Sequence, residues 1–443
     1  MNYIYEFPDF IDAYSDVKIV HPNNKSYVVG AYIDDKDFLC TDEVMSSIQA
    51  DLIDLASAVY IADWFSGKQQ SVKKTILIRL PLRNAVIFNQ SKIQNELQNL
   101  LNTYTGDHWS FQIYQRNCPG RLAETCGRQL QLFDEKSEVA LWSGGLDSFA
   151  GLYGRISDKT ANHYTLLGTG SNTQIQGKQT GLAQAIQRAG KISVKSIQIP
   201  IHCRYQGIRP PTNPVFRARG FVFKLIGAVC AMLARQTRLF IYENGYGAIN
   251  LPFRRSEVGL AHTRSVHPIS LIKTGEFISH VVEAEFTYEN PYLFSTKTQM
   301  CNAIGEHAKL AFDTITCDRR YRQADQPSQC GYCSSCLLRR IAFINVFGYD
   351  HTEYVATHGS LPRRRKDYEH FWAMKEQVVK LREILDSTEP WQDMSQRYSE
   401  LPRIVRQMSR VYSIERSAVE KQLLQMYHNH VHEWEYAEPH LMQ

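Results

Sequence analysis

The sequence predicts an α/β protein built on a doubly wound parallel sheet, with an N-terminal α+β domain before it and a helical region after it. From about residue 136, short apolar strands alternate with helical segments, and a long helical periodicity follows Pro362. A chain of 443 residues also exceeds the usual size of one hydrophobic core. We therefore expect domains at 1–135, 136–350 and 351–443.

The composition excludes a disordered or a fibrous protein. Hydrophobic residues make up 43% of the chain and charged residues 21%, as in ordinary globular proteins. The formal net charge of +5 is mild and does not indicate direct nucleic-acid binding. The start has no secretory-signal pattern, and no apolar stretch approaches the roughly 20 residues that span a bilayer. We expect a cytoplasmic protein without a membrane segment. The sequence leaves open whether the protein forms a homo-oligomer.

The N-terminal region mixes helical and strand patterns. Apolar residues at helical spacing from Ile48 to Val59 predict a helix, and alternation within 73–82 predicts a strand. A second amphipathic helix includes Ile93, and a strand at 108–115 follows it. No catalytic signature is identified here, so recognition of a partner or substrate is the expectation for this domain.

The central region reads as strand, helix, strand, helix. The predicted strands are 138–142, 163–170, 191–201 and 237–245, and the predicted helices are 148–156, 177–190 and 216–235. Such crossovers are long enough for parallel pairing of successive strands. Ligands in open parallel sheets bind beyond the carboxyl ends of the strands, so the segments that follow the strands are the first candidates for a site.

The C-terminal region is predicted to be helical. Apolar residues from Phe371 to Leu385 form one helical stripe, and 400–435 reads as further helix. The basic run 362–366 fits a solvated linker better than an RNA contact. The histidines in 428–434 fit exposed polar surface better than a metal site, because no further ligands lie nearby in the sequence.

A glycine-rich turn stands between the first central strand and its helix, in the string "SGGLDS". Gly144 and Gly145 leave backbone amides open to an anion, and the following helix N-terminus favours negative charge. Asp147 is suited to cap the helix or to hold Mg²⁺. The string is neither a Walker A motif nor the Rossmann fingerprint. The predicted phosphate-binding residues are Ser143, Gly144, Gly145, Leu146, Asp147 and Ser148.

Four of the ten cysteines have metal-ligand spacing. Cys317, Cys330, Cys333 and Cys336 follow the pattern Cys-x12-Cys-x2-Cys-x2-Cys. Two-residue gaps allow thiolates to converge on one ion, so a closed, structural zinc site is predicted. An iron–sulfur cluster is the main alternative, although the continuation typical of bacterial clusters is absent. Free buried cysteines are the weaker alternative.

Together these motifs resemble a known family. The string SGGxDS is similar to the pyrophosphate loop (PP-loop) of the N-type ATP pyrophosphatases, which have the adenine nucleotide alpha hydrolase fold. With the C…CGxCxxCLLR segment that begins about 170 residues later at Cys317, it resembles the QueC family of 7-cyano-7-deazaguanine synthases over residues 137–348. The resemblance implies cleavage of ATP between its α and β phosphates, with ATP, Mg²⁺ and Zn²⁺ as cofactors.

Two further site residues follow from this likeness, and a third segment follows from its place after a strand. Arg219 matches the arginine of the family's Ala-Arg-Asn helix start, with Gly220 in place of the asparagine, and Lys297 matches a lysine that precedes a helix. Both are expected to neutralise phosphate charge, and with Asp147 they are the predicted catalytic residues. Glu243, Asn244 and Gly245 end the fourth strand and are expected to read a purine-like edge. A simple glycine-rich turn is the alternative for this segment.

The chain departs from the family in two respects. It adds about 135 residues before the common core and about 95 after it. The family's Asp-Tyr-Gly-Gln is replaced by the segment 168–176. Enlarged QueC-like proteins of bacterial antiviral operons, the QatC group, are similar. They imply a ligase that attaches a 7-deazaguanine carboxylate to a partner protein. The alternatives are nitrile synthesis with ammonia, tRNA thiolation and a non-catalytic nucleotide-binding scaffold.

Overall fold

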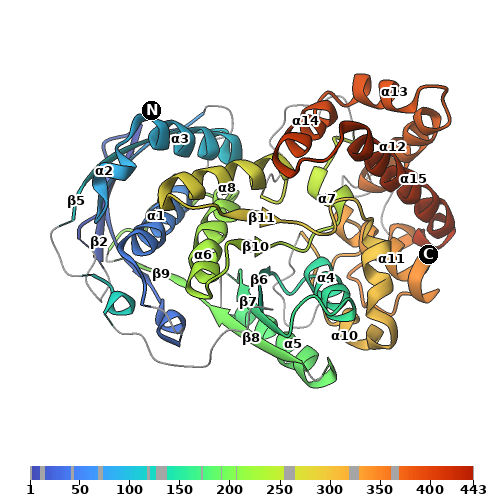
Figure 1. Cartoon of the computed structure of the whole chain (residues 1–443), viewed down its shortest axis with the longest axis horizontal. Helices are drawn as coiled ribbons and strands as arrows, with labels where there is room; N and C mark the ends of the chain where they lie inside the picture. The colour runs from blue at the N-terminus through green and yellow to red at the C-terminus, as the bar shows by residue number, and fades with distance from the viewer. Residues whose placement is uncertain are drawn as a thin grey trace.

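The computed structural model describes residues 2–9, 15–40, 44–67, 73–116, 120–125, 137–170, 173–190, 192–205, 207–253, 265–318, 329–360 and 369–442. Two β-sheets and a group of C-terminal helices follow one another along the long axis of the molecule (Figure 1). Residues 362–366, for which we predicted a solvated linker, lie outside the described residues. None of the helices in the described ranges combines the length and apolar character needed to cross a bilayer.

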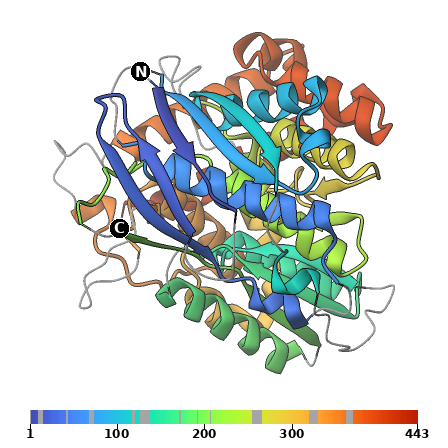
Figure 2. The same cartoon turned by 90° about the vertical axis from the view of Figure 1, so that its left-hand side faces the viewer.

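The N-terminal sheet has six strands in the order β5-β4-β1-β2-β3-β9, and one of its faces is turned to the viewer in Figure 2. Its strands are β1 (Asn2–Glu6), β2 (Ser15–Val20), β3 (Ser26–Ile33), β4 (Thr75–Leu82), β5 (His108–Gln115) and β9 (Ile201–Tyr205). The neighbours β1, β4 and β5 are parallel, whereas β2, β3 and β9 pair in antiparallel fashion. The strands predicted at 73–82 and 108–115 are confirmed. In β4, Ile76, Ile78 and Leu80 are all fully buried, because alternate side chains point to one face.

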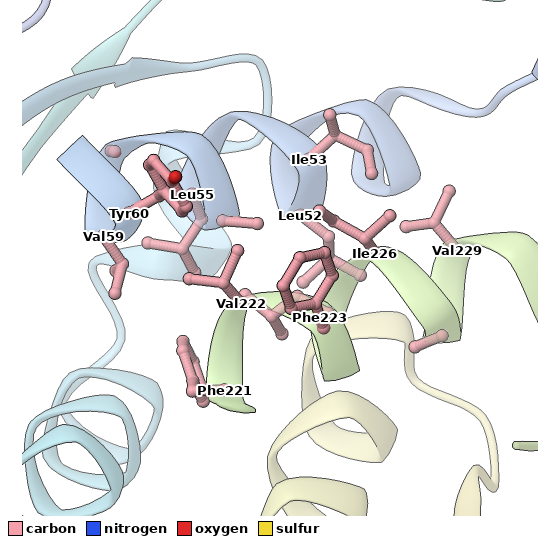
Figure 3. Packing of buried hydrophobic residues seen from close by; sticks show 14 of the residues in the cluster. Leu52, Ile53, Leu55, Val59, Tyr60, Phe221, Val222, Phe223, Ile226 and Val229 are labelled. Atoms are coloured by element: carbon pink, nitrogen blue, oxygen red, sulfur yellow. The ribbon is translucent and has the colours of Figure 1, made fainter. Parts of the chain in front are cut away.

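Helix α1 (Ser47–Trp64) lies between this sheet and the central domain. Every residue from Ala50 to Asp63 is buried, so the helix has no solvent face. Figure 3 shows Leu52 and Val59 of α1 among side chains of α6 (Arg219–Leu233), such as Val222 and Ile226. One hydrophobic core therefore joins the predicted N-terminal domain to the central one. The predicted boundary near residue 135 itself lies outside the described residues.

The central sheet has five strands, all parallel, in the order β11-β10-β6-β7-β8. They are β6 (Ser137–Trp142), β7 (His163–Gly168), β8 (Ser193–Gln198), β10 (Arg238–Phe240) and β11 (Thr287–Glu289). Successive residues belong to different cores: Val139 packs with α6, and Ala140 packs with α4 (Leu146–Ser157). The sheet is therefore covered by helices on both faces, which confirms a mixed α/β fold with a parallel sheet.

The order of the central strands reverses at β6. The chain first runs outward through β7 and β8 and then returns to the other side of β6 with β10 and β11. At such a reversal the loops after the two central strands diverge to opposite faces and leave room for a ligand between them. The segments that follow β6 and β10 are the glycine-rich turn and the Glu243–Asn244–Gly245 turn.

Three strand predictions need correction. The strand predicted at 237–245 is shorter, because β10 ends at Phe240 and Asn244 already caps the helix α7 (Gly245–Ile249). The strand predicted at 191–201 is two strands, because β8 ends at Gln198 and β9 begins at Ile201 and joins the N-terminal sheet beside β3. Pro200, which lacks an amide hydrogen, lies between them. The short strand β11 was missed, since three residues carry too little periodicity to be recognised.

The C-terminal region is helical, as predicted. Its helices are α12 (Glu369–Leu385), α13 (Pro390–Arg397), α14 (Leu401–Tyr412) and α15 (Arg416–Leu441), which pack on α11 (Ser334–Phe347) in a separate hydrophobic core. In the predicted stripe, Phe371, Met374, Val378 and Leu381 are buried. The other described helices are α2 (Ala85–Phe88), α3 (Ser91–Thr105), α5 (Thr173–Gly190), α7 (Gly245–Ile249), α8 (Pro268–Val282), α9 (Lys297–Cys301) and α10 (Ala308–Phe312), with short 3-10 turns between some of them.

Candidate functional site

The glycine-rich turn joins β6 to α4. Gly144 has φ of +70°, a conformation that residues with a side chain rarely adopt. Gly145 is the N-cap of α4, and Leu146 is the first residue of the helix. The Gly145 amide donates to Ser143 Oγ over 3.1 Å, and Ser148 Oγ donates to the Gly145 carbonyl over 2.9 Å. The turn is thus ordered by its own hydroxyls, and it presents a helix N-terminus, which favours an anion.

Asp147 lies in the first turn of α4 and has a different partner on each carboxylate oxygen. Asn244 Nδ2 donates to Oδ1 over 2.9 Å, and Lys297 Nζ forms an ion pair with Oδ2. Asp147 is 9% exposed, Asn244 1% and Lys297 6%. The partners are 97 and 150 positions from Asp147 in the sequence. The structure therefore brings together residues from three separate predictions.

Lys297 is charged at this position. Burial by itself would lower the pKa of its ammonium group, but the nearby carboxyl groups of Asp147 and Glu243 outweigh burial and raise the pKa above its ordinary value. A fixed positive charge therefore lies beside the first turn of α4.

Glu243 brings a second carboxyl group to the same point. Its Oε1 accepts a hydrogen bond from Asn244 Nδ2 over 3.0 Å, so one amide group bridges Glu243 and Asp147. Burial and the negative charge of Asp147 raise the pKa of Glu243 to about 8. Among the described residues, two carboxyl groups share one ammonium, which leaves the cluster short of positive charge. Such a cluster favours a proton or a divalent cation with oxygen ligands.

The turn after β10 holds Asn244 in one orientation. Asn244 is the N-cap of α7, and its Oδ1 accepts from the Gly247 amide over 2.8 Å. Its Nδ2 must then point toward the carboxyl groups. Gly245 has a packing role here, because a Cβ at this position would lie 1.8 Å from the Leu293 carbonyl oxygen. The segment is therefore both a tight turn and part of the candidate site.

The sequence analysis missed two site residues. The side chain of each hydrogen-bonds to backbone groups at the end of a strand that is distant in the sequence. Gln179 of α5 donates to the Ser143 carbonyl over 2.9 Å and accepts from the Gly170 amide over 3.2 Å, which ties the ends of β6 and β7 together. Asn290, just after β11, donates to the Glu243 carbonyl over 2.8 Å. A polar residue directly after a strand was the available signal for Asn290, but β11 itself was not recognised.

The segment before the first cysteine forms one wall of the glycine-rich turn. The Ile315 amide donates to the Gly144 carbonyl over 3.4 Å, and the Leu146 amide donates to Thr316 Oγ1 over 3.4 Å. The fully buried Arg339 of α11 donates to Thr316 Oγ1 over 3.3 Å. This connection was also missed, although the position of Thr316 next to Cys317 was a local signal for it.

The four predicted metal ligands converge. The Sγ atoms of Cys317, Cys330, Cys333 and Cys336 all lie within 4.8 Å of one another, and all four residues are buried. A Zn–S bond of about 2.3 Å places the sulfurs of a tetrahedral site about 3.8 Å apart. The Sγ atoms of Cys330 and Cys336 are 3.8 Å apart, so this donor set fits such an ion. The cluster could hold a metal ion such as zinc.

Arg219 is the first residue of α6. Its guanidinium donates to the Thr169 carbonyl at the end of β7 and lies 5.3 Å from the centre of the Phe223 ring. It therefore occupies the same edge of the parallel sheet, but one strand further along.

The histidine segment differs from its prediction at one position. His428 and His432 are exposed, with 3.3 Å between their Nε2 atoms. His430 is only 2% exposed, and burial lowers its pKa to about 3. The prediction of exposed polar surface is therefore wrong for His430, because α15 turns this residue toward α7. Of the remaining cysteines, Cys230 and Cys301 are buried, while Cys118 and Cys126 lie outside the described residues.

No protein-family model and no curated protein matches the chain. The likeness to the QueC family thus depends on its motifs alone, and a function has to be supported by the geometry of the site.

Proposed function

We propose that the chain is an ATP-dependent ligase that adenylates a 7-deazaguanine carboxylate, 7-carboxy-7-deazaguanine, and transfers the acyl group to an amine of a partner protein. The observation that carries this proposal is the buried Asp147–Asn244–Lys297 cluster beside the glycine-rich turn, at the point where the strand order reverses. Anion-binding amides, a fixed cation and spare carboxyl groups are the features that a magnesium-bound triphosphate requires.

The chemistry has two steps. A carboxylate is a poor acyl donor, because an amine that attacks it would have to expel oxide. In the first step a carboxylate oxygen bonds to the α-phosphorus of ATP, the bond from that phosphorus to the bridging oxygen breaks, and pyrophosphate leaves. In the second step the amine nitrogen attacks the acyl carbon. The bond from that carbon to the AMP oxygen breaks, AMP leaves with the electron pair of this bond, and the amine loses a proton.

The chain's own residues have defined roles in this proposal. The turn from Ser143 to Ser148 binds the departing pyrophosphate through its amides and hydroxyls. Lys297 and Arg219 neutralise charge that builds on the phosphates. Asp147 and Glu243 would hold Mg²⁺, which supplies further neutralisation of phosphate charge when bound. Asn244 keeps the two carboxyl groups at a fixed separation.

A partner protein is the proposed acceptor because the chain adds large regions to the core that resembles the QueC family. The segment 168–176 also lacks that family's Asp-Tyr-Gly-Gln, which is the reason to propose conjugation rather than nitrile synthesis. A place in antiviral defence follows only from the likeness to the QatC group and belongs to the same proposal.

The test is incubation with ATP, 7-carboxy-7-deazaguanine and a candidate partner protein encoded beside this chain, followed by intact-mass measurement. We expect a mass increase on the partner together with release of AMP and pyrophosphate. Free nitrile without a mass increase would identify the ammonia-dependent synthase instead. If no substrate gives AMP and pyrophosphate, the remaining hypothesis is a non-catalytic nucleotide-binding scaffold.

A matched pair of variants assigns the chemistry to the cluster. Asp147→Asn should lower AMP formation by about 100-fold or more, as expected for loss of a charged group at the reacting phosphates. Asp158→Asn changes an exposed aspartate at the other end of the same helix and should leave the rate within about twofold. Equal rates for the two variants would contradict the proposed site.

A further inference from the structure

Helix α15 of the C-terminal region places three side chains on one face, toward the candidate site. Met426, His430 and Glu433 are spaced by four and three residues, which brings them onto one stripe of the helix. Met426 is fully buried and His430 is 2% exposed. This stripe lies outside the part of the chain that resembles the QueC family, and no role was assigned to it from the sequence.

The first half of the stripe packs against the turn that carries Asn244. The His430 ring stacks on Tyr246 with 3.9 Å between ring centres and 29° between ring planes. Tyr246 is held in turn by a 2.6 Å hydrogen bond from its hydroxyl to Gln377. A Cβ on Gly245 would lie 2.5 Å from Met426 Sδ. The turn therefore has α15 directly behind it.

The second half of the stripe reaches the helix that carries Lys297. Thr296 is the N-cap of α9, and its Oγ1 accepts from the Gln299 amide over 3.1 Å. The same hydroxyl donates to Glu433 Oε1 over 2.5 Å. Thr296 is 1% exposed, so this hydrogen bond is shielded from water. Lys297 is the next residue along the chain.

Helix α15 itself is anchored to α11. Asn345 Nδ2 donates to the Glu433 carbonyl over 2.9 Å, and Arg340 donates to the Leu441 carbonyl over 2.6 Å. The contacts with the site are therefore made from a fixed helix.

We infer that α15 is a positioning element of the site and that Glu433 is its positioning residue for Lys297. The two partners that hold the carboxylate oxygens of Asp147 each belong to a segment packed on α15. The inference concerns how the charge of Lys297 is placed, and it rests on the proposed function for its effect on turnover.

The hydrogen bond from Thr296 suggests the conservative variant. Burial raises the pKa of Glu433 to about 7, with the hydrogen bond from Thr296 acting in the opposite direction. A carboxyl group can accept from or donate to the threonine hydroxyl, and a glutamine side chain can do the same with its amide. Glu433→Gln should therefore keep the position of α9, whereas Glu433→Ala should release it.

The first experiment does not depend on catalysis. Amide hydrogen exchange in α9, read by mass spectrometry on the full chain, should be about fivefold faster in Glu433→Ala, as expected for a weakened helix cap. Glu433→Gln should match the parent. Glu435→Ala is the matched control, because Glu435 is an acidic residue of the same helix that pairs with Arg382 of α12. Equal exchange in Glu433→Ala and Glu435→Ala would overturn the inference.

The second experiment separates positioning from general stability. Glu433→Ala should lower kcat for AMP formation about tenfold and leave KM for ATP within about twofold, because Lys297 acts mainly on charge that develops during the reaction. Glu433→Gln should restore kcat. A kcat loss in Glu433→Ala no greater than in Glu435→Ala would overturn the inference. If Glu433→Ala does not fold, Glu433→Asp, which is shorter by one methylene, takes its place with the same expected direction.

The two proposals fail in different ways. If the parent protein forms no AMP with any acid, the proposed function fails, and the exchange of α9 still decides whether Glu433 holds this helix. If the parent is active and α9 is unaffected by Glu433→Ala, only the inference about α15 is wrong.

Discussion

Asp54 in the N-terminal domain and Asp147 in the central domain are both buried aspartates, but their surroundings differ in charge. Asp54 is paired with Arg83, Arg116 and Arg121, the first two over 2.7 and 2.8 Å. Burial alone would raise the pKa of Asp54, yet the three guanidinium groups outweigh it and hold the pKa below its ordinary value. Among the described residues, Asp147 pairs with a single cation, Lys297, which it shares with the nearby Glu243.

This difference is the one that we expect between a structural cluster and a ligand site. Around Asp54, arginines that follow β4 and β5 neutralise the carboxylate and tie strand ends to α1. Around Asp147 and Glu243, the described residues supply a single cation, Lys297, and burial with the charge of Asp147 raises the pKa of Glu243 to about 8. A charge deficit at the carboxyl ends of parallel strands indicates a ligand site, whereas a neutralised cluster indicates a structural role.

The cysteine cluster should show the largest effect. Its four buried sulfurs converge, and a bound metal ion would supply the positive charge that four thiolates require. Removal of the ion by a chelator should lower the free energy of unfolding by ~5 kcal/mol or more, since ion binding and folding are coupled in such sites. Because Thr316 contacts the glycine-rich turn, amide exchange at 143–148 should rise as well. Metal analysis with thermal unfolding checks this. A protein without bound metal, or with unchanged unfolding after chelation, would contradict it.

The second prediction compares the two aspartates directly. Asp54→Asn should lower the free energy of unfolding by ~3–5 kcal/mol, because it leaves buried guanidinium groups without their shared carboxylate. Asp147→Asn should cost ~1 kcal/mol or less, because Glu243, whose pKa is raised by the charge of Asp147, can then ionise beside Lys297 in its place. Urea denaturation measures both.

The control for the two aspartate variants is a substitution in an exposed ion pair. Glu276→Ala removes the partner of Arg410 at the surface and should change stability by ~0.5 kcal/mol or less. Equal losses for Asp54→Asn and Asp147→Asn would remove the distinction between a structural and a binding cluster.

The smallest effect concerns a buried group that carries no charge. Burial lowers the pKa of His430 to about 3 from its model-peptide value of 6.5. As the pH falls below 6.5, the unfolded chain takes up the proton first, so stability present above pH 6.5 is lost as the pH falls toward 3. The slope should be ~1.4 kcal/mol per pH unit from this residue.

His430→Phe keeps a ring against Tyr246 and should remove that part of the slope, as measured by urea denaturation from pH 7 to pH 5. His358, whose pKa is lowered to about 4 by burial and by Arg340, should account for a remaining slope. The same slope in His430→Phe and the parent would show that α15 does not bury a neutral histidine against the site.

Much of this molecule was predictable where the controlling interactions are local. The alternation in β4 and the helical stripe of α12 identify both elements and their buried faces. The glycine pair between a strand and a helix marks the turn, and the spacing of the cysteines indicates convergence on one ion. The failures are of another kind. His430 lies between two exposed histidines, and its position on the apolar face of the helix with Met426 and Trp434 was not recognised. The apolar spacing in α1 predicts the helix but not its burial on every side, which includes the carboxyl groups of Asp51, Asp54 and Asp63.

The amino-acid sequence by itself determined the parallel α/β class, the glycine-rich turn and the four-cysteine cluster, because these depend on local periodicity or on residues within about twenty positions of one another. Only the tertiary structure decided that Lys297 and Asn244 meet on Asp147, that β9 leaves for another sheet, and that α15 lies behind the site. Those contacts join residues that are far apart in the chain, and their geometry is set by how whole elements pack, which no local pattern records.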